Sequence, residues 1–462
     1  KSFVWAPLQL DSHQHSHHKV YQLVKVIVNM KFSTVALLGL MATSASAFTS
    51  SVSRPNGVRA GTSLNNFVDT AEYAERDVYT FDEWAASCGV QKCDGFQLTT
   101  NDGSDYFAVT SSDLPAGTPI VYIPPEMVLS SNRAQEEFGQ SLQYAEERIK
   151  EGGVANQIPI FRLGVKILAE WEKGDQSPWY YWLNSMPRVF MNGVSMTSAC
   201  FDALPPYAGW LATKERINFV NFKKALLSAP LNEQTVTNDD LVKWAYNVAL
   251  TRSYSLSSSC RRIAPFADYF NHDAEPNMDI TYSDYACTVY AKRDIAAGEP
   301  LTMSYGAGTN PSPLFATYGF LDESSPGTFC KLMELQDDMV EMKFGFKDLL
   351  FYKNGEISPE VYDLVLYSIL KTDPNFELAP FYDACMSGDE DTKNAYHSQY
   401  FSYTLDYLKN HVGTTLSELD RLSGLAASYD PAVHPRAPLI MQHNAFVKET
   451  FEAVKYNLDT MG

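Results

Sequence analysis

The chain of 462 residues lacks the features that mark membrane, nucleic-acid-binding and disulfide-stapled proteins. Its apolar stretch 32–41 is too short to span a bilayer, which needs about twenty residues. Lysine and arginine number 36 against 55 aspartate and glutamate, and no basic run offers a surface to phosphates. The seven cysteines are odd in number and lack disulfide or zinc spacing, at Cys88, Cys93, Cys200, Cys260, Cys287, Cys330 and Cys385.

These absences leave a large acidic protein with a net charge of −19 and 45% hydrophobic residues. A chain of this length can bury a sizeable core and should form about two or three domains. We therefore expect a mature protein that is soluble and reduced, with no metal site and no membrane or nucleic-acid partner. We also expect a monomer.

The N-terminal part of the chain is typical of a targeting segment. Residues 1–29 precede Met30 and are predicted to be an untranslated or leader extension. Residues 30–68 combine a short apolar run, the small residues Ala45-Ser46-Ala47, and a stretch from Phe48 that contains arginine and no acidic residue. This order resembles the bipartite presequence of algae with complex plastids, which predicts the plastid stroma. The alternative is a secretory signal followed by a linker.

The rest of the chain alternates between strand and helix patterns. Strand patterns at 95–98, 106–110 and 120–124 give way to helical periodicity, and strands return at 279–282, 287–291 and 301–305. Strands interrupted by helices and then resumed predict one α+β domain at 80–325, with a helical insertion at about 132–249. From 329 to 462 the periodicity is helical and predicts a separate domain.

Two short segments carry the strongest functional signal. The first is Asp268-Tyr269-Phe270-Asn271-His272, and the second, about thirty residues later, is a short strand that ends in Tyr305. Burying an asparagine and a histidine costs free energy unless their polar atoms are matched, so the first segment indicates a ligand pocket. Together the segments resemble the SET domain of protein lysine methyltransferases. The most similar subgroup contains the Rubisco large-subunit methyltransferase and the actin-histidine methyltransferases.

The resemblance implies a fold and a cofactor. The expected fold is a SET β-fold with a pseudoknot that brings Asn271 close to Tyr305, followed by an all-α domain that binds the protein substrate. The expected cofactor is S-adenosyl-L-methionine. A tyrosine or histidine by itself is usually structural, so the resemblance depends on the ordered set of residues from Arg252 to Phe320.

The resemblance also assigns roles to individual residues. Tyr305 matches the catalytic tyrosine, whose hydroxyl points at the methyl group in transfer. The residues expected to bind the cofactor are Ser104, Asp105, Tyr106, Arg252, Asp268, Asn271, His272, Tyr318, Gly319 and Phe320. The residues expected to line the substrate channel are Tyr282, Tyr285 and Tyr318.

One segment departs from the family pattern. Many SET domains have a Gly-X-Gly loop that lets the backbone approach the cofactor closely. The corresponding stretch here is Gly103-Ser104-Asp105-Tyr106-Phe107, without the second glycine. The side chain of Asp105 or Tyr106 would either crowd the cofactor or add a contact to it.

The sequence therefore predicts a protein-lysine N-methyltransferase that uses S-adenosyl-L-methionine and acts on a plastid protein. Family and compartment suggest the Rubisco large subunit or fructose-bisphosphate aldolase as the substrate. Two alternatives stay open. One is a catalytically silent SET-like module that binds a partner protein, and the other is a protein-histidine N-methyltransferase.

Overall fold

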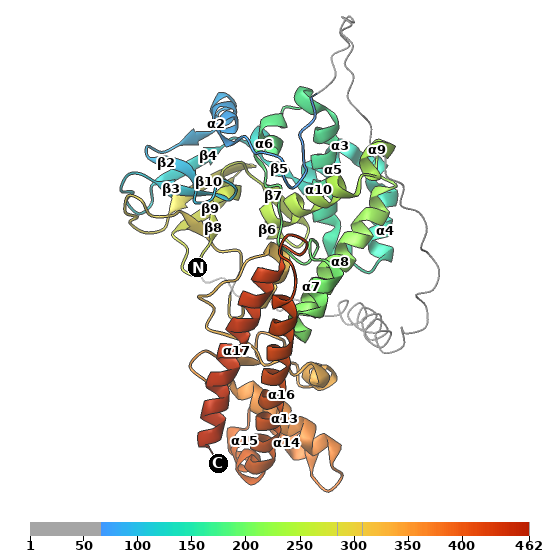
Figure 1. Cartoon of the computed structure of the whole chain (residues 1–462), viewed down its shortest axis with the longest axis vertical. Helices are drawn as coiled ribbons and strands as arrows, with labels where there is room; N and C mark the ends of the chain where they lie inside the picture. Colours follow the sequence, from blue (N-terminus) through green and yellow to red (C-terminus); the bar gives the residue numbers. More distant parts are fainter. Residues whose placement is uncertain (1–65, 284, 307, 462) are drawn as a thin grey trace, which may run out of the picture.

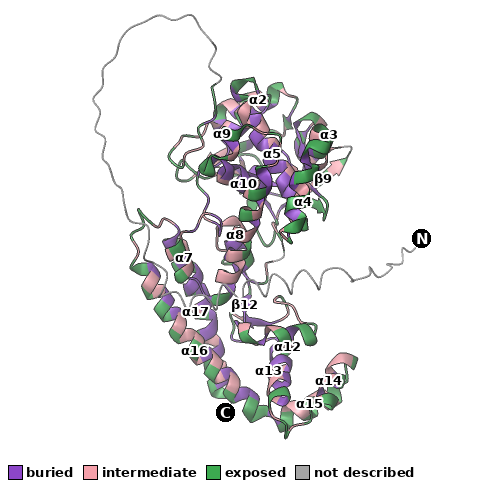
Figure 2. Cartoon of the chain, turned by 90° about the vertical axis from the view of Figure 1, so that its right-hand side faces the viewer, coloured by how far each residue is buried: buried purple, intermediate pink, exposed green. Residues whose placement is uncertain are grey.

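The molecule has an upper part of mixed sheets and helices and a lower part built mainly from helices (Figure 1). The computed structural model describes residues 66–283, 285–306 and 308–461. The leader extension and nearly all of the predicted presequence lie outside these residues. Seen from the side, two long helices, α16 (Phe401–Ala427) and α17 (Ala437–Thr460), run side by side along the lower part (Figure 2).

Small sheets make up the β structure of the upper part. The largest has four antiparallel strands in the order β1-β4-β10-β9, and β2 pairs with β3 in a hairpin. A second sheet has the order β5-β7-β6, and β8 pairs with β11. The strands are β1 (Gln91–Lys92), β2 (Phe96–Thr100), β3 (Tyr106–Thr110), β4 (Pro119–Ile123), β5 (Leu129–Ser130), β6 (Tyr254–Ser257), β7 (Cys260–Ile263), β8 (Asn271–His272), β9 (Met278–Ser283), β10 (Ala286–Ala291) and β11 (Thr302–Met303).

Helices fill the stretch in which the sequence predicted an insertion. In α5 the apolar periodicity becomes a buried face, and Gly164 on that face lets the ring of Phe222 on α8 approach closely. A Cβ at Gly164 would lie 2.6 Å from that ring. The upper helices are α2 (Val78–Ser87), α3 (Ser131–Phe138), α4 (Gln143–Glu151), α5 (Ile158–Glu172), α6 (Tyr180–Ser185), α7 (Ser198–Asp202), α8 (Pro206–Leu226), α9 (Glu233–Val236), α10 (Asp239–Arg252) and α11 (Ser312–Tyr318).

The C-terminal part is helical, as predicted, with one addition. A short antiparallel sheet of two strands pairs Phe329 with Leu350, and both residues are buried in this part of the molecule. The all-α expectation is therefore corrected at this sheet, whose strands are too short for sequence periodicity to separate them from helix. The elements are β12 (Gly327–Phe329), α12 (Gln336–Glu341), β13 (Leu350–Tyr352), α13 (Pro359–Thr372), α14 (Leu378–Ser387), α15 (Glu390–Gln399), α16 and α17. No helix within the described ranges is long and apolar enough to cross a membrane.

Helix α11 connects the two parts. At its start, the hydroxyl of Ser312 lies 2.9 Å from Nε2 of His443 on α17, and the ring of Phe315 packs 4.5 Å from the same histidine. At its end, Gly319 adopts a left-handed conformation with φ of +83°. The C-terminal helices therefore contact the same short helix that ends at Tyr318.

The first described residues already belong to the folded body. Phe67 stacks on Trp171 of α5 with ring centroids 4.8 Å apart, and the indole nitrogen of Trp171 donates to the carbonyl of Val68 at 2.9 Å. Val68 itself is 3% exposed. Val68, the last residue of the segment predicted as a presequence, is thus part of the core.

Replacing Gly319 with alanine should destabilise the protein. A Cβ there would lie 2.6 Å from backbone atoms of Met191 and Asn192, and the positive φ adds strain of about 1–3 kcal/mol. We expect a lower melting temperature in a thermal unfolding scan. The matched control is Gly424→Ala on the exposed face of α16, where nothing lies within 4 Å and alanine favours the helix. Equal melting temperatures for the two variants would contradict this account.

Candidate active site

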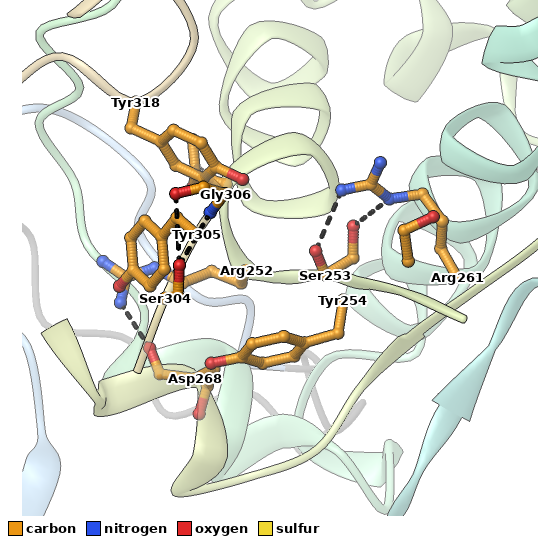
Figure 3. Close-up of a pocket in the computed structure, with 11 residues that line it drawn as sticks. Arg252, Ser253, Tyr254, Arg261, Asp268, Ser304, Tyr305, Gly306 and Tyr318 are labelled. Carbon is orange, nitrogen blue, oxygen red and sulfur yellow. Dashed lines mark hydrogen bonds between the residues drawn. The ribbon is translucent and has the colours of Figure 1, made fainter. Parts of the chain in front are cut away.

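A cavity of about 340 Å³ opens where the end of α10 meets the segments that follow β7 and β11 (Figure 3). Its polar lining comes from parts of the chain more than fifty residues apart. In this view Tyr318 lies above Tyr305 and Asp268 below it, and the side chain of Arg252 extends between them. The lining residues are Thr251, Arg252, Ser253, Tyr254, Ser255, Arg261, Asp268, Ser304, Tyr305, Gly306 and Tyr318.

The backbone of residues 267–270 anchors three side chains of the site. Each side chain donates a hydrogen bond to a main-chain carbonyl of this segment, and all three bonds are 2.7 Å long. The pairs are Tyr254 with Ala267, Arg252 with Asp268, and Tyr305 with Phe270. Because a buried carbonyl needs a donor, these bonds satisfy the backbone and orient the side chains together.

The hydroxyl of Tyr305 can only accept further hydrogen bonds, because its proton is already donated. Its only proton is donated to the carbonyl of Phe270, so its remaining lone pairs are free. Burial raises the pKa of Tyr305, although the nearby Arg252 opposes the shift, and the phenol therefore stays protonated at neutral pH. Such an oxygen can accept weak C–H···O contacts from a polarised methyl group.

The predicted convergence of the two signal segments is confirmed. Strand β8 pairs in parallel with β11, with Asn271 opposite Thr302 and His272 opposite Met303. The backbone N–H of Tyr305 then donates to Nδ1 of His272 at 3.1 Å, and the two rings lie 5.5 Å apart. The predicted strand 301–305 is shorter than expected because this side chain, rather than a neighbouring strand, receives the N–H of Tyr305.

The expected burial of Asn271 was wrong. The sequence predicted that both residues of the Asn-His step would be buried, but Asn271 is exposed. The imidazole of His272 is buried, with a side-chain exposure of 3%. Successive side chains of a strand point to opposite faces, so only one of the two can face the interior.

Asp268 is held in an apolar setting. The indole nitrogen of Trp182 on α6 donates to its Oδ2 at 3.2 Å, whereas its Oδ1 has no hydrogen-bond partner within the described part of the chain. Burial raises the pKa of Asp268 to about 6, against the opposing effect of Arg252. The Nε of Arg252 is also buried without a partner. Two unsatisfied polar atoms of opposite character on residues that line one cavity indicate a polar ligand.

The segment 104–106 lies beside the cavity but does not line it. The carboxylate of Asp102 accepts the backbone N–H groups of Ser104 and Asp105 at 2.8 and 2.9 Å, which closes the loop on itself. Arg76 holds it from the other side by donating to the carbonyl of Ser104 at 2.6 Å. The charge of Asp105 contributes to the raised pKa of Tyr305, which places this carboxylate near the site. The side chains of this loop therefore leave the cavity open.

Tyr318 and Phe320 surround the catalytic candidate, as the resemblance implied. The rings of Tyr318 and Phe320 lie 4.8 and 6.1 Å from that of Tyr305. Gly319 between them allows the chain to turn out of α11. Burial raises the pKa of Tyr318, and the positive charge of Arg261 opposes this rise.

The two tyrosines of the β9–β10 region differ in position. Neither lines the cavity, but burial raises the pKa of Tyr282 and its hydroxyl lies close enough to Asp268 for that charge to contribute. The ring of Tyr285 packs against the guanidinium groups of Arg133 and Arg262, at 4.6 and 4.7 Å, and the ring of Tyr282 also lies 5.0 Å from the guanidinium of Arg262. The expectation that Tyr285 lines the site is corrected, because its backbone has a φ of +70° and its ring stacks on these arginines.

Sequence reasoning missed several residues of the site. Tyr254 and Arg261 line the cavity, and Arg76 bonds the loop at Ser104 and also donates to the carbonyl of Ser185 at 2.8 Å. Tyr254 lies only two positions after Arg252 and could have been found from that spacing. Arg76 had no local signal, because its partners lie far away in the sequence. Among the described residues no acidic, histidine or cysteine cluster could hold a metal ion.

Comparisons with known proteins agree with this geometry. The SET domain family model matches residues 105–306. SET domain-containing protein 8 of Schizosaccharomyces pombe is 31% identical over 97 residues, which are 21% of this chain and 23% of that protein. The actin-histidine N-methyltransferase of Danio rerio is 22% identical over 247 residues, 49% of this chain and 39% of that protein. The chain thus spans well under two thirds of these curated relatives.

Solved structures share the fold over a larger part of the chain. The SET domain of LSMT bound to lysine and AdoHcy has a TM-score of 0.58 at 13% identity, covering 83% of this chain and 91% of that one. Rubisco LSMT bound to AdoMet has a TM-score of 0.56 at 14% identity, covering 83% and 92%. At this identity the likeness establishes the fold.

The raised pKa of Asp268 predicts a pH-dependent stability. An unfolded aspartate has a pKa of about 3.9, so between about pH 4 and pH 6 the folded protein holds a proton that the unfolded chain releases. The contribution of Asp268 to stability is present below this window and is lost as the pH rises through it, by about 2–3 kcal/mol. Asp268→Asn should therefore gain in stability relative to the unmodified protein between pH 4 and pH 7, measured by denaturant unfolding. A constant difference across this range would contradict the assignment.

The fold, the pairing of β8 with β11 and the position of Tyr305 now agree with the family match. The sequence resemblance to the SET domain is thereby confirmed. The chain contains a SET domain, matched over residues 105–306, and has the fold of the LSMT kind.

Proposed function

We propose that the protein is an S-adenosyl-L-methionine-dependent protein N-methyltransferase that acts on the ε-amino group of lysine. The observation that carries the proposal is the hydroxyl of Tyr305, whose proton is donated to Phe270 and whose lone pairs are free beside the cavity. The family match and the AdoMet-bound structural relative support the same activity.

The residues of the cavity fit this cofactor. Arg252 carries a charge and an unpaired Nε, which suit a carboxylate such as that of an amino-acid moiety. Asp268 carries an unpaired oxygen, which suits a cationic or N–H-bearing group. When bound, S-adenosyl-L-methionine supplies an electrophilic methyl group on a sulfonium centre. Tyr305 offers an oxygen to that methyl group, and the protein needs no nucleophile of its own.

The acceptor amine must be neutral before it can attack. The tyrosines around the site do not take its proton near neutral pH, because burial raises the pKa of both Tyr254 and Tyr305. The proton therefore leaves to solvent, and the tyrosine rings orient the neutral amine for attack.

Two alternatives lead to different experimental outcomes. A silent binding module was motivated by the missing glycine in 103–107, but the side chains of this loop do not line the cavity. A histidine acceptor is suggested by the likeness to the actin-histidine N-methyltransferase. Both alternatives use the same pocket. The silent module transfers no methyl group, whereas the histidine methyltransferase transfers it to a histidine instead of a lysine.

The cellular setting is a further part of the proposal. The presequence pattern at 30–68 supports import into the plastid stroma, with the secretory pathway as the alternative. Within a plastid, the Rubisco large subunit and fructose-bisphosphate aldolase are the substrates that the family resemblance favours. We propose that the protein acts as a monomer on such a partner.

Methyl transfer can be tested directly. Purified protein is incubated with plastid stromal proteins and cofactor labelled on its methyl group, and we expect label in one or a few protein bands. Acid hydrolysis of those bands should release methyl-lysine, whereas methyl-histidine would establish the alternative acceptor. Absence of transfer, together with no heat of binding in calorimetric titration with the cofactor, would indicate a silent module.

Tyr305→Phe should lower turnover without weakening cofactor binding. The variant loses the oxygen that contacts the methyl group, and we expect kcat to fall about ten- to a hundred-fold. Arg252 and Asp268 remain, so the Kd for the cofactor in calorimetry should change less than three-fold or so. Tyr403→Phe, at an exposed position on α16, is the control. If cofactor binding collapsed in Tyr305→Phe, Tyr305 would be a structural residue.

A further inference from the structure

Asp322 is a buried acidic residue next to the histidine that supports Tyr305. Its Oδ2 lies 3.7 Å from Nε2 of His272, and the side chains are 8% and 3% exposed. It follows the Tyr318-Gly319-Phe320 segment by two residues. The ring of Phe320 packs 5.7 Å from that of His272. One short stretch of chain therefore contacts both His272 and the ring of Tyr305.

The hydrogen bond at Nδ1 of His272 shows which tautomer the ring has in this structure. Its Nδ1 accepts the backbone N–H of Tyr305 at 3.1 Å and must carry a lone pair, so a neutral ring has its proton on Nε2. This Nε2 is buried and has no hydrogen-bond partner among the residues that the structure describes. The carboxylate of Asp322 is an anion that faces it, at a distance typical of an electrostatic contact rather than a full hydrogen bond.

The surroundings of Asp322 keep its negative charge. Burial would raise its pKa, but hydrogen bonds from Ser324 and Ser325 outweigh this effect, and the pKa is lowered. Those bonds are 2.6–3.0 Å long. A carboxylate with its charge retained favours an N–H on the ring nitrogen that faces it.

Gly308 leaves room for this arrangement. A Cβ at this position would lie 2.8 Å from Oδ2 of Asp322 and 4.0 Å from Nε2 of His272. A larger residue would push the carboxylate out of place. The backbone that follows Tyr305 thus runs close to the Asp322–His272 pair.

We propose that Asp322 is a positioning residue that keeps His272 in the Nε2–H tautomer and thereby fixes the backbone of Tyr305. Because Nδ1 of His272 carries no proton, it can accept the backbone N–H of Tyr305. The hydroxyl of Tyr305 donates to the carbonyl of Phe270, so both ends of the residue are held by hydrogen bonds. The kinetic consequence of this inference rests on the proposed methyl transfer, whereas the tautomer itself does not.

Three variants separate this role from simple support of a turn. Asp322→Leu keeps the approximate shape and removes the acceptor, whereas Asp322→Asn keeps an oxygen that can face Nε2. The control is the double variant Ser324→Ala/Ser325→Ala, which removes the two hydroxyl hydrogen bonds of Asp322 but keeps the bond from the backbone N–H of Ser324 and the contact with His272. Thermal unfolding scans identify any variant that fails to fold.

The kinetic expectation is a loss of turnover alone. Asp322→Leu should lower kcat about ten- to a hundred-fold, as for other residues that orient a histidine, with KM for cofactor and acceptor nearly unchanged. Asp322→Asn, which keeps an oxygen but loses the charge, should lose less than Asp322→Leu, and the double serine variant should stay within a few-fold of the unmodified protein. An equal loss in the double serine variant, or an unchanged kcat in Asp322→Leu, would overturn the proposal.

A second experiment measures the protonation of the His272 ring nitrogens by nuclear magnetic resonance and does not depend on any activity. In protein labelled with ¹⁵N-histidine, the two ring nitrogens of His272 should show an N–H at Nε2 and an unprotonated Nδ1, assigned by comparison with a His272→Asn variant. Asp322→Leu should shift these signals toward a mixture of tautomers. Unchanged signals in that variant would refute the role of Asp322. If the unmodified protein transferred no methyl group, the methyltransferase proposal would fail while this experiment still decided the inference.

Discussion

The site depends on the burial of one short piece of backbone, residues 267–270. Burying peptide carbonyls costs free energy unless donors reach them, and here the donors are the side chains that face the cavity. The preceding residue, Phe266, has a φ of +70° that a non-glycine residue seldom adopts. Its ring is packed against Phe81 and Phe96 at 4.7 and 5.6 Å, and this packing maintains the strained turn.

Helix α6 holds this segment, and α11 forms another wall of the site. Trp182 and Ser185 on α6 bond to Asp268 and to the hydroxyl of Tyr269, at 3.2 and 2.9 Å. The opposite wall depends on α11, which places Tyr318 beside Tyr305 and contacts His443 of the C-terminal helices. The helical regions thus shape the pocket as well as enlarging the protein.

The loop at 103–107 keeps its shape without the second glycine of the family pattern. Gly103 keeps a φ of +79°, and Asp102 satisfies the amides of the turn. Arg76 fixes the outer face of this loop, and its guanidinium lies 5.1 Å from the ring of Tyr106. The loop is therefore held beside the cavity by its own side chains, and the pocket does not depend on a second glycine.

Local pattern alone established the strands near 95–98 and 106–110 and the helical stretch that contains α5, because these follow from residue alternation and helical periodicity. The motif order also placed Arg252, Asp268, Tyr305 and Tyr318 in one site. It could not give the exposure of Asn271, the position of Tyr285 or the roles of Arg76 and Asp322. Those depend on contacts between residues far apart in the chain, and only tertiary packing decides which buried polar atoms meet.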